Sequence, residues 1–178
     1  MTTTFLDLFY YDKLTTHSLE KIIIDYADIS LDDILYDILD RPELVQILIY
    51  SKADIHEHHI LDRSCSRGYY NTTELLIKSK ANVNPRSFIS PLSCASNNGH
   101  ILIVKLLLEH NADVTKDNNL AVRWASEEGH AEIVKMLIQY KADITADNNC
   151  AIRDAKFRNR HEVVKILEKE YERLGITL

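Results

Sequence analysis

The sequence predicts an all-α fold, a solenoid of stacked helix-turn-helix units joined by short finger turns. Three features predict it because they recur with nearly the same period. The dipeptide Ala-Asp or Ala-Asn, followed by Val or Ile, returns at spacings of 28, 31 and 30 residues, starting at Ala53, Ala81, Ala112 and Ala142. A glycine recurs at Gly68, Gly99 and Gly129, and an apolar segment recurs at 103–108, 133–138 and 163–167. One helix pair cannot bury its apolar face alone, whereas stacked pairs can, so this shared period predicts a solenoid.

The composition fits a globular helical protein and argues against several classes. The chain has 178 residues, of which 46% are apolar, and this allows one domain with a sizeable core. It holds 4 glycines and 3 prolines, fewer than a loop-rich β-sandwich or barrel normally carries. The net charge is −6 and no block of like charge stands out, so we expect neither nucleic acid nor an anionic membrane surface as a partner.

The chain also lacks the usual signs of secretion or membrane insertion. Residues 1–10 have no basic region, and Asp7 interrupts their apolar side chains. The longest apolar runs, such as 101–104, are too short to span a bilayer. The chain has three cysteines, Cys65, Cys94 and Cys150. This number is too small for a disulfide framework, and because it is odd, the cysteines cannot all pair within the chain. We therefore expect a soluble intracellular protein.

The unit around residue 130 illustrates the predicted helix pair. A first helix is expected over 120–128, and Gly129 ends it because glycine tolerates the left-handed turn that closes a helix. A second helix is expected over 131–140, where apolar residues at i, i+1, i+4 and i+5 form a wide stripe. The polar segment 141–149 is expected to be the finger turn that leads to the next unit.

The residues of the preceding unit resemble a known family. Ser90-Pro91-Leu92-Ser93-Cys94-Ala95 resembles the Thr-Pro-Leu-His-x-Ala signature of ankyrin repeats. The segments 98–108 and 111–114 resemble the rest of that consensus, and the likeness extends over about residues 60–170. The resemblance implies an ankyrin-repeat solenoid that binds another protein.

Two later units depart from the signature in the same way. Asp-Asn-Asn precedes Ala-Val-Arg at 117–123 and Ala-Ile-Arg at 147–153. This variant is similar to the ankyrin proteins of giant DNA viruses that infect amoebae. The resemblance implies a viral protein with a host protein as its partner, located in the host cytoplasm.

We assign the whole chain, 1–178, to a single ankyrin-repeat domain. Residues 1–30 are expected to form an N-terminal cap or degenerate repeat, and 150–178 a C-terminal capping repeat. Between them we expect four clear repeats, at 31–59, 60–88, 89–119 and 120–149. The cap assignment at the C-terminal end depends on the highly polar segment 168–173, because a terminal repeat must face water on its outer side.

Candidate chemistry is sparse. His56-Glu57-His58-His59 could bind zinc or nickel, but its spacing matches no helical ligand pair and it lies where a finger turn is expected, so we favour a solvated turn. The three cysteines fall at different positions of their units and are not expected to converge on a metal. His100 and His130 follow the interhelix glycines, where ankyrin histidines usually bond to nearby backbone. No phosphate-binding glycine loop is present, and we expect no cofactor and no enzymatic activity.

Arg123 and Arg153 replace the histidine of the signature in adjacent units. They are expected to lie side by side, where like charges need partners. We expect each arginine to pair with a nearby acid and tether a finger to a helix, with Asp117, Asp147 or Asp154 as the candidates. A direct contact with a partner protein is the alternative.

The predicted binding surface follows from the resemblance, since ankyrin partners usually contact the concave face of the stack. The residues just before each interhelix glycine, or its counterpart, differ from unit to unit while the core positions repeat. They are Ser66, Arg67, Asn97, Asn98, Glu127, Glu128, Phe157 and Arg158. Trp124 either joins them as an exposed anchor or packs in the core between units.

We therefore expect a monomer that binds an unidentified host protein. Two alternatives are an adaptor that recruits substrates to a host ubiquitin ligase and a structural component of the virion. An enzyme is the most remote possibility.

Overall fold

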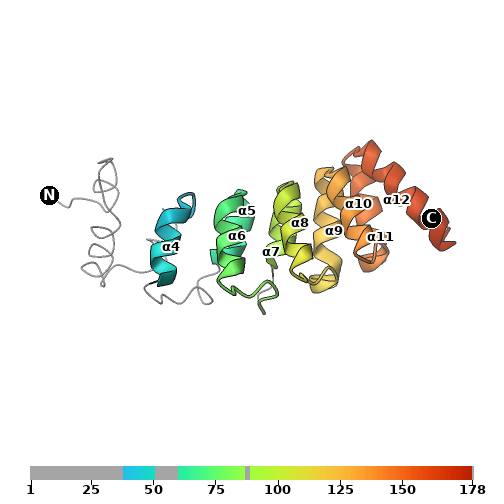
Figure 1. Ribbon diagram of the computed structural model, residues 1–178. Helices are drawn as coiled ribbons and strands as arrows, with labels where there is room; N and C mark the ends of the chain where they lie inside the picture. The colour runs from blue at the N-terminus through green and yellow to red at the C-terminus, as the bar shows by residue number, and fades with distance from the viewer. Residues whose placement is uncertain (1–37, 51–59, 87–88, 178) are drawn as a thin grey trace.

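The computed structural model describes residues 38–50, 60–86 and 89–177 (Figure 1). The predicted cap at 1–30 and the histidine cluster at 56–59 lie outside these residues. Within the described ranges the chain forms nine helices and no strands, which confirms the all-α prediction. The helices are α4 Pro42–Tyr50, α5 Ile60–Arg67, α6 Tyr70–Lys78, α7 Pro91–Asn97, α8 Ile101–Glu109, α9 Lys116–Glu128, α10 Ala131–Gln139, α11 Ala146–Phe157 and α12 His161–Leu174.

The helices stack in two layers along the chain. The first helices of successive units, α5, α7, α9 and α11, contact one another in that order, and so do the second helices, α6, α8, α10 and α12. Each first helix also packs on the second helix of its own unit. Figure 1 shows the resulting row, which runs in chain order from α4 to α12. This arrangement is the predicted solenoid.

Local sequence signals set the bounds of the helices. At the start of α7 the hydroxyl of Ser90 accepts a hydrogen bond from the backbone N–H of Ser93 at 3.1 Å, and Pro91 occupies the first turn, where a missing N–H costs nothing. At the end of α9, Gly129 adopts the predicted left-handed conformation, with φ 89°.

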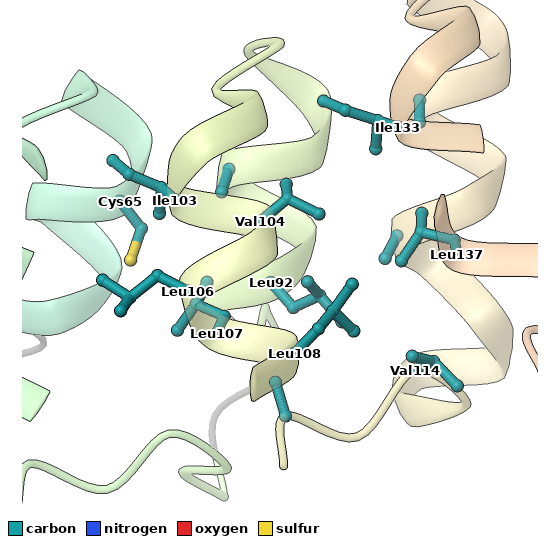
Figure 2. Packing of buried hydrophobic residues seen from close by; sticks show 14 of the residues in the cluster. Cys65, Leu92, Ile103, Val104, Leu106, Leu107, Leu108, Val114, Ile133 and Leu137 are labelled. Atoms are coloured by element: carbon teal, nitrogen blue, oxygen red, sulfur yellow. The ribbon is translucent and has the colours of Figure 1, made fainter. Parts of the chain in front are cut away.

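The core runs through the stack as one apolar cluster that extends from Ile38 to Tyr171. Figure 2 shows how side chains of α8, among them Ile103, Val104 and Leu107, fill the space between successive units. Each unit buries its apolar stripe between its own two helices and against its neighbours. The interfaces between units therefore hold the fold together.

The first turns of α9 and α11, which continue the finger turns, contain a kink that the sequence did not predict. Asp117, Asn118 and Asn119 all adopt left-handed backbone conformations, with φ between 53° and 59°, and the three residues 147–149 repeat this geometry. The backbone N–H of Asn119 closes the turn on the carbonyl of Thr115 at 3.0 Å. Three successive left-handed residues are costly for most side chains, and Asn and Asp tolerate them best. The left-handed backbone thus explains why Asp and Asn occupy these three positions in both units.

Candidate protein-binding surface

The structure brings the predicted binding residues into one row. Ser66 and Arg67 end α5, Asn97 and Asn98 end α7, and their counterparts lie at the ends of α9 and α11. Because these four helices lie side by side in the first layer, their C-terminal ends are adjacent. We call this set the helix-end row: Ser66, Arg67, Asn97, Asn98, Glu127, Glu128, Phe157 and Arg158.

Side chains of the next unit reach back to the helix-end row and bond to its backbone. Nε2 of His100 lies 3.0 Å from the carbonyl oxygen of Ser66, and Nε2 of His130 lies 3.0 Å from that of Asn97. Since the carbonyl can only accept, each Nε2 donates, and the predicted structural role of these histidines is confirmed. Arg160 stands 30 residues after His130 and takes the same role, donating from Nε to the carbonyl of Glu127 at 2.9 Å.

The interhelix glycines make room for these side chains. A Cβ built on Gly99 would lie 2.6 Å from the ring of His130, and one on Gly129 would lie 2.8 Å from Cδ of Arg160. Glycine is therefore needed at these positions for two reasons: it adopts a positive φ without strain, and it leaves space for the side chain of the next unit. In the last unit Asn159 stands at the corresponding place, with φ 57° and a Cβ of its own.

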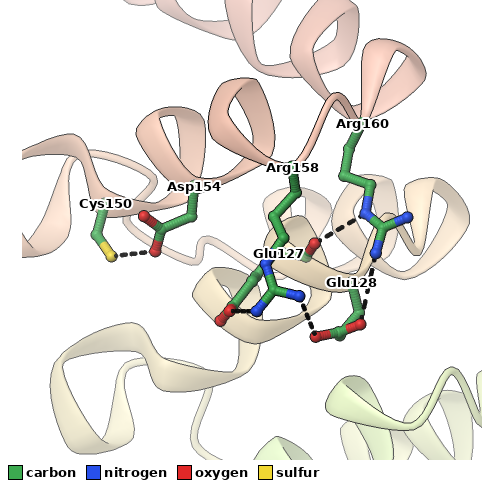
Figure 3. A network of polar contacts seen from close by, with 6 residues as sticks. All are labelled: Glu127, Glu128, Cys150, Asp154, Arg158 and Arg160. Carbon is green, nitrogen blue, oxygen red and sulfur yellow. Dashed lines mark hydrogen bonds and ion pairs between the residues drawn. The ribbon is translucent and has the colours of Figure 1, made fainter.

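The acids of the row are engaged within the chain. Arg158 bonds to the carboxylate of Glu127 and lies 3.9 Å from that of Glu128, and Arg160 lies 3.6 Å from Glu128 (Figure 3). Both glutamates are partly buried. A partner that needed these carboxylates would have to displace the arginines, so this part of the row acts first as a joint between two units.

Phe157 differs from the rest of the row because its side chain is 86% exposed. It is the counterpart of Glu127, which the next unit covers. The ring therefore leaves apolar surface open to solvent at this end of the row.

Trp124 lies on α9, one turn before Glu128, and its side chain is partly buried. It does not belong to the buried cluster, and it is not fully exposed either. Part of the indole is therefore accessible from the surface, as an anchor residue requires, while the remainder is held by the stack.

The two signature arginines behave differently. Nη2 of Arg123 lies 2.6 Å from Oδ2 of Asp147 in the next finger, which confirms the predicted tether. For Arg153 the prediction of an acidic partner is wrong, because no acid of the described chain lies within ion-pair distance of it. Thr177 occupies the place 30 residues after Asp147 and carries no charge. The nearby Asp154 accepts a hydrogen bond from Cys150 instead (Figure 3).

The cysteines are structural side chains. Cys65 is buried on α5, and burial raises the pKa of its thiol far above the ordinary value. Burial also raises the pKa of Cys94 to about 12. Both thiols therefore stay protonated at neutral pH and are poor nucleophiles and poor metal ligands. Within the described ranges, no three His, Cys, Asp or Glu side chains gather as a metal site would require.

Tyr171 is a structural residue that the sequence did not reveal. Its hydroxyl lies 3.0 Å from the carbonyl oxygen of Ile144 and 2.8 Å from Oδ1 of Asn149, and its ring is buried. In the preceding unit the corresponding Asn119 accepts a bond from the N–H of Asp143 in the next finger. Tyr171 thus provides from α12 a contact that elsewhere comes from the following unit.

None of the described helices combines the length and the apolar character needed to cross a bilayer.

Comparison with known proteins covers the part of the stack from α4 to α10. A family model described as "Ankyrin repeats (3 copies)" matches residues 36–118 and 61–148. A similar relative is the "Ankyrin repeat and KH domain-containing protein mask" of Drosophila melanogaster, which is 45% identical over 58 residues. That alignment covers 31% of this chain and 1% of the relative, so the chain corresponds to only a small part of that protein.

Proposed function

Because the chain belongs to the ankyrin repeat family, whose repeats are generally protein–protein interaction modules, we propose that it binds a partner protein on the concave face of its stack. In this proposal the helix-end row and Trp124 make the contact, and the chain acts as a monomer without catalysis. The observation that carries the proposal is the exposed aromatic ring of Phe157 in a row whose other members vary from unit to unit.

The contrast between buried and exposed positions supports this role. One turn inside the row, the buried positions keep an apolar character, with Leu92, Val122 and Ile152 at equivalent places. The positions of the row that the next unit only partly covers or leaves exposed change from serine to asparagine to glutamate to phenylalanine. A constant frame with changing surface side chains lets each unit read a different part of a partner.

Within the row, the aromatic side chains are the proposed anchors. Covering a large aromatic ring removes about 150–250 Å² of surface from water. Large aromatic side chains are among the residues that contribute most to the binding energy of an interface. Phe157 is the first candidate because it is the most exposed, and Trp124 the second. Glu127 and Glu128, held by Arg158 and Arg160, form the polar rim.

The test is affinity purification from a lysate, with Phe157→Ser compared with the wild type. We expect the wild type to recover a specific protein that the variant loses. Leu102→Ser is the matched control, since Leu102 is also exposed, at 67%, but lies on α8 in the second layer. Loss of the partner with Leu102→Ser and not with Phe157→Ser would place binding on the other layer and contradict the proposal.

The finer assignment concerns the partner and its location. The resemblance of the Asp-Asn-Asn units to those of giant amoeba-infecting viruses supports a host protein as partner and the host cytoplasm as location. Two experiments separate the alternatives. Recovery of ubiquitin-ligase subunits when the same purification is performed from amoeba lysate favours the adaptor. Detection of the chain in purified virus particles by mass spectrometry favours a virion component.

A further inference from the structure

The inference starts from two equivalent arginines, one with its acid and one without. Arg123 and Arg153 hold the same place in successive units. The guanidinium of Arg123 lies 2.6 Å from the carboxylate of Asp147. Arg153 is exposed, and no acid in the described ranges pairs with it. The last unit thus keeps the arginine of the repeat, but the described chain has no counterpart of Asp147 to pair with it.

Phe157 lies on the same side of α11, one turn after Arg153. Residues four apart on a helix have Cβ atoms about 5–6 Å from each other, so the cation and the exposed ring are neighbours. We call this pair the α11 edge: Arg153 and Phe157. In the preceding unit the corresponding edge, Arg123 and Glu127, is covered by side chains of the next unit.

The points at which a following unit would attach differ at the α11 edge from those in the preceding units. At Gly99 the next unit's histidine ring occupies the place of a Cβ, whereas Asn159 carries a Cβ at the corresponding position. Oδ1 of Asn149, which corresponds to the acceptor that bonds the next finger in the preceding unit, is already bonded by Tyr171. Both attachment points therefore differ from those that join the preceding units.

The charges around the edge select the chemistry of its occupant. Arg158 and Arg160 are offset by Glu127 and Glu128, and Lys156 lies 2.9 Å from Glu168. This leaves Arg153 as the cation on α11 that has no offsetting acid in the described chain. A carboxylate is the group that matches the planar fork of an arginine.

We infer that the α11 edge binds a segment of the partner protein that carries Asp or Glu beside a large apolar side chain. The carboxylate takes at Arg153 the place that Asp147 has at Arg123, and the apolar side chain covers Phe157. The inference rests on the proposed protein-binding function and adds to it the chemistry of the partner.

The probe is a library of random peptides displayed on phage and selected on the full-length chain. We expect the enriched peptides to share an acidic residue next to an aromatic or large aliphatic residue. Selection on Arg153→Glu reverses the requirement, so its enriched peptides should carry Lys or Arg in place of the acid. Enrichment of the same acidic peptides on Arg153→Glu, or of peptides without an acid on the wild type, overturns the inference.

Affinities then locate the contact. A synthetic peptide of the enriched sequence should bind Arg153→Ala and Phe157→Ser at least about tenfold more weakly than the wild type, since each variant removes a charge-assisted bond or an apolar contact. Lys165→Ala is the matched charge control, because Lys165 is exposed on α12 and pairs with no acid of the described chain. Unchanged melting temperatures establish that all three variants are folded.

The outcomes separate the inference from the function on which it rests. If peptide binding depends on Trp124 and not on Arg153 or Phe157, the inference about the α11 edge fails, whereas the proposed binding on the concave face is kept. If no peptide is enriched while the lysate still yields a partner, the inference fails again and the function stands. If neither experiment yields a ligand, both fail.

Discussion

At the scale of single residues, side chains that reach from one unit into the next define the stack. His100, His130 and Arg160 bond to the backbone of the preceding unit, and each lies over a glycine of that unit. Arg123 bonds to the following finger. Such contacts join neighbouring units, so their removal should weaken an interface without changing either helix.

Arg123→Ala should lower the free energy of unfolding by about 1 kcal/mol, because it removes a partly buried ion pair between units. Urea unfolding followed by circular dichroism measures the change. Arg153→Ala is the matched control and should leave stability unchanged within about 0.5 kcal/mol, since Arg153 is exposed and forms no ion pair in the described chain. Equal losses for the two variants would show that the bond to Asp147 contributes nothing.

Gly99→Asn separates the two reasons for glycine at the interhelix turn. Asparagine tolerates the positive φ, as Asn159 shows, but its Cβ would meet the ring of His130. We therefore expect a loss of about 2 kcal/mol or more from displacement of the ring and loss of its bond to Asn97. Melting curves check this, and the double variant Gly99→Asn, His130→Ala should lose less than the two single changes added together. Full additivity would mean that the backbone conformation, and not the space, requires glycine.

At the scale of elements, the helices were predictable from the sequence and the finger turns were not. The predicted helix over 131–140 is observed as α10, Ala131–Gln139, which starts two residues after Gly129 and carries the predicted apolar stripe. The left-handed run at 117–119 escaped prediction, since a polar segment rich in Asn and Asp is compatible with many turns. The repetition of the Asp-Asn-Asn sequence at 147–149 was the one sign in the sequence that these residues share a special backbone geometry.

The geometry of the proposed binding surface was predictable to the same partial degree. The period placed the helix-end row correctly along the first-layer helices, yet it could not show that Glu127 and Glu128 are held by arginines of the next unit. Such pairs depend on side-chain reach across an interface. The unpaired state of Arg153 could have been predicted, because the period aligns Thr177 with Asp147.

Asn118 tests the left-handed turn as an element. Its φ is 58°, and its side chain is exposed. Asn118→Ala should destabilise the protein by about 1 kcal/mol, since alanine tolerates this conformation poorly, while Asn118→Gly should be neutral or slightly stabilising. Asn148 lies at the equivalent place with φ 56°, so the same pair of changes there should give the same result. Chemical denaturation measures all four variants, and an alanine that costs nothing would contradict the left-handed geometry.

At the scale of the whole molecule, the main helix contacts among the described residues join neighbouring units, so stability should vary along the stack. The middle units are covered on both sides. The α12 unit is covered on one side, and Tyr171 supplies from within it the bond to Asn149 that a following finger makes at Asn119.

Tyr171→Phe should therefore loosen one end of the molecule and leave the rest intact. The change keeps the buried ring and removes the hydroxyl bonds to Ile144 and Asn149, at a cost of about 1 kcal/mol. Hydrogen exchange followed by mass spectrometry should show faster exchange in α12 and in the finger at 144–149, with α7 and α8 unchanged. Leu107→Ala, in the centre of the core, is the contrasting variant: it should cost about 2–5 kcal/mol and accelerate exchange in the units on both sides of α8. Uniform acceleration of all helices by Tyr171→Phe would mean that the stack unfolds as one cooperative unit, and the nearest-neighbour description would then be wrong.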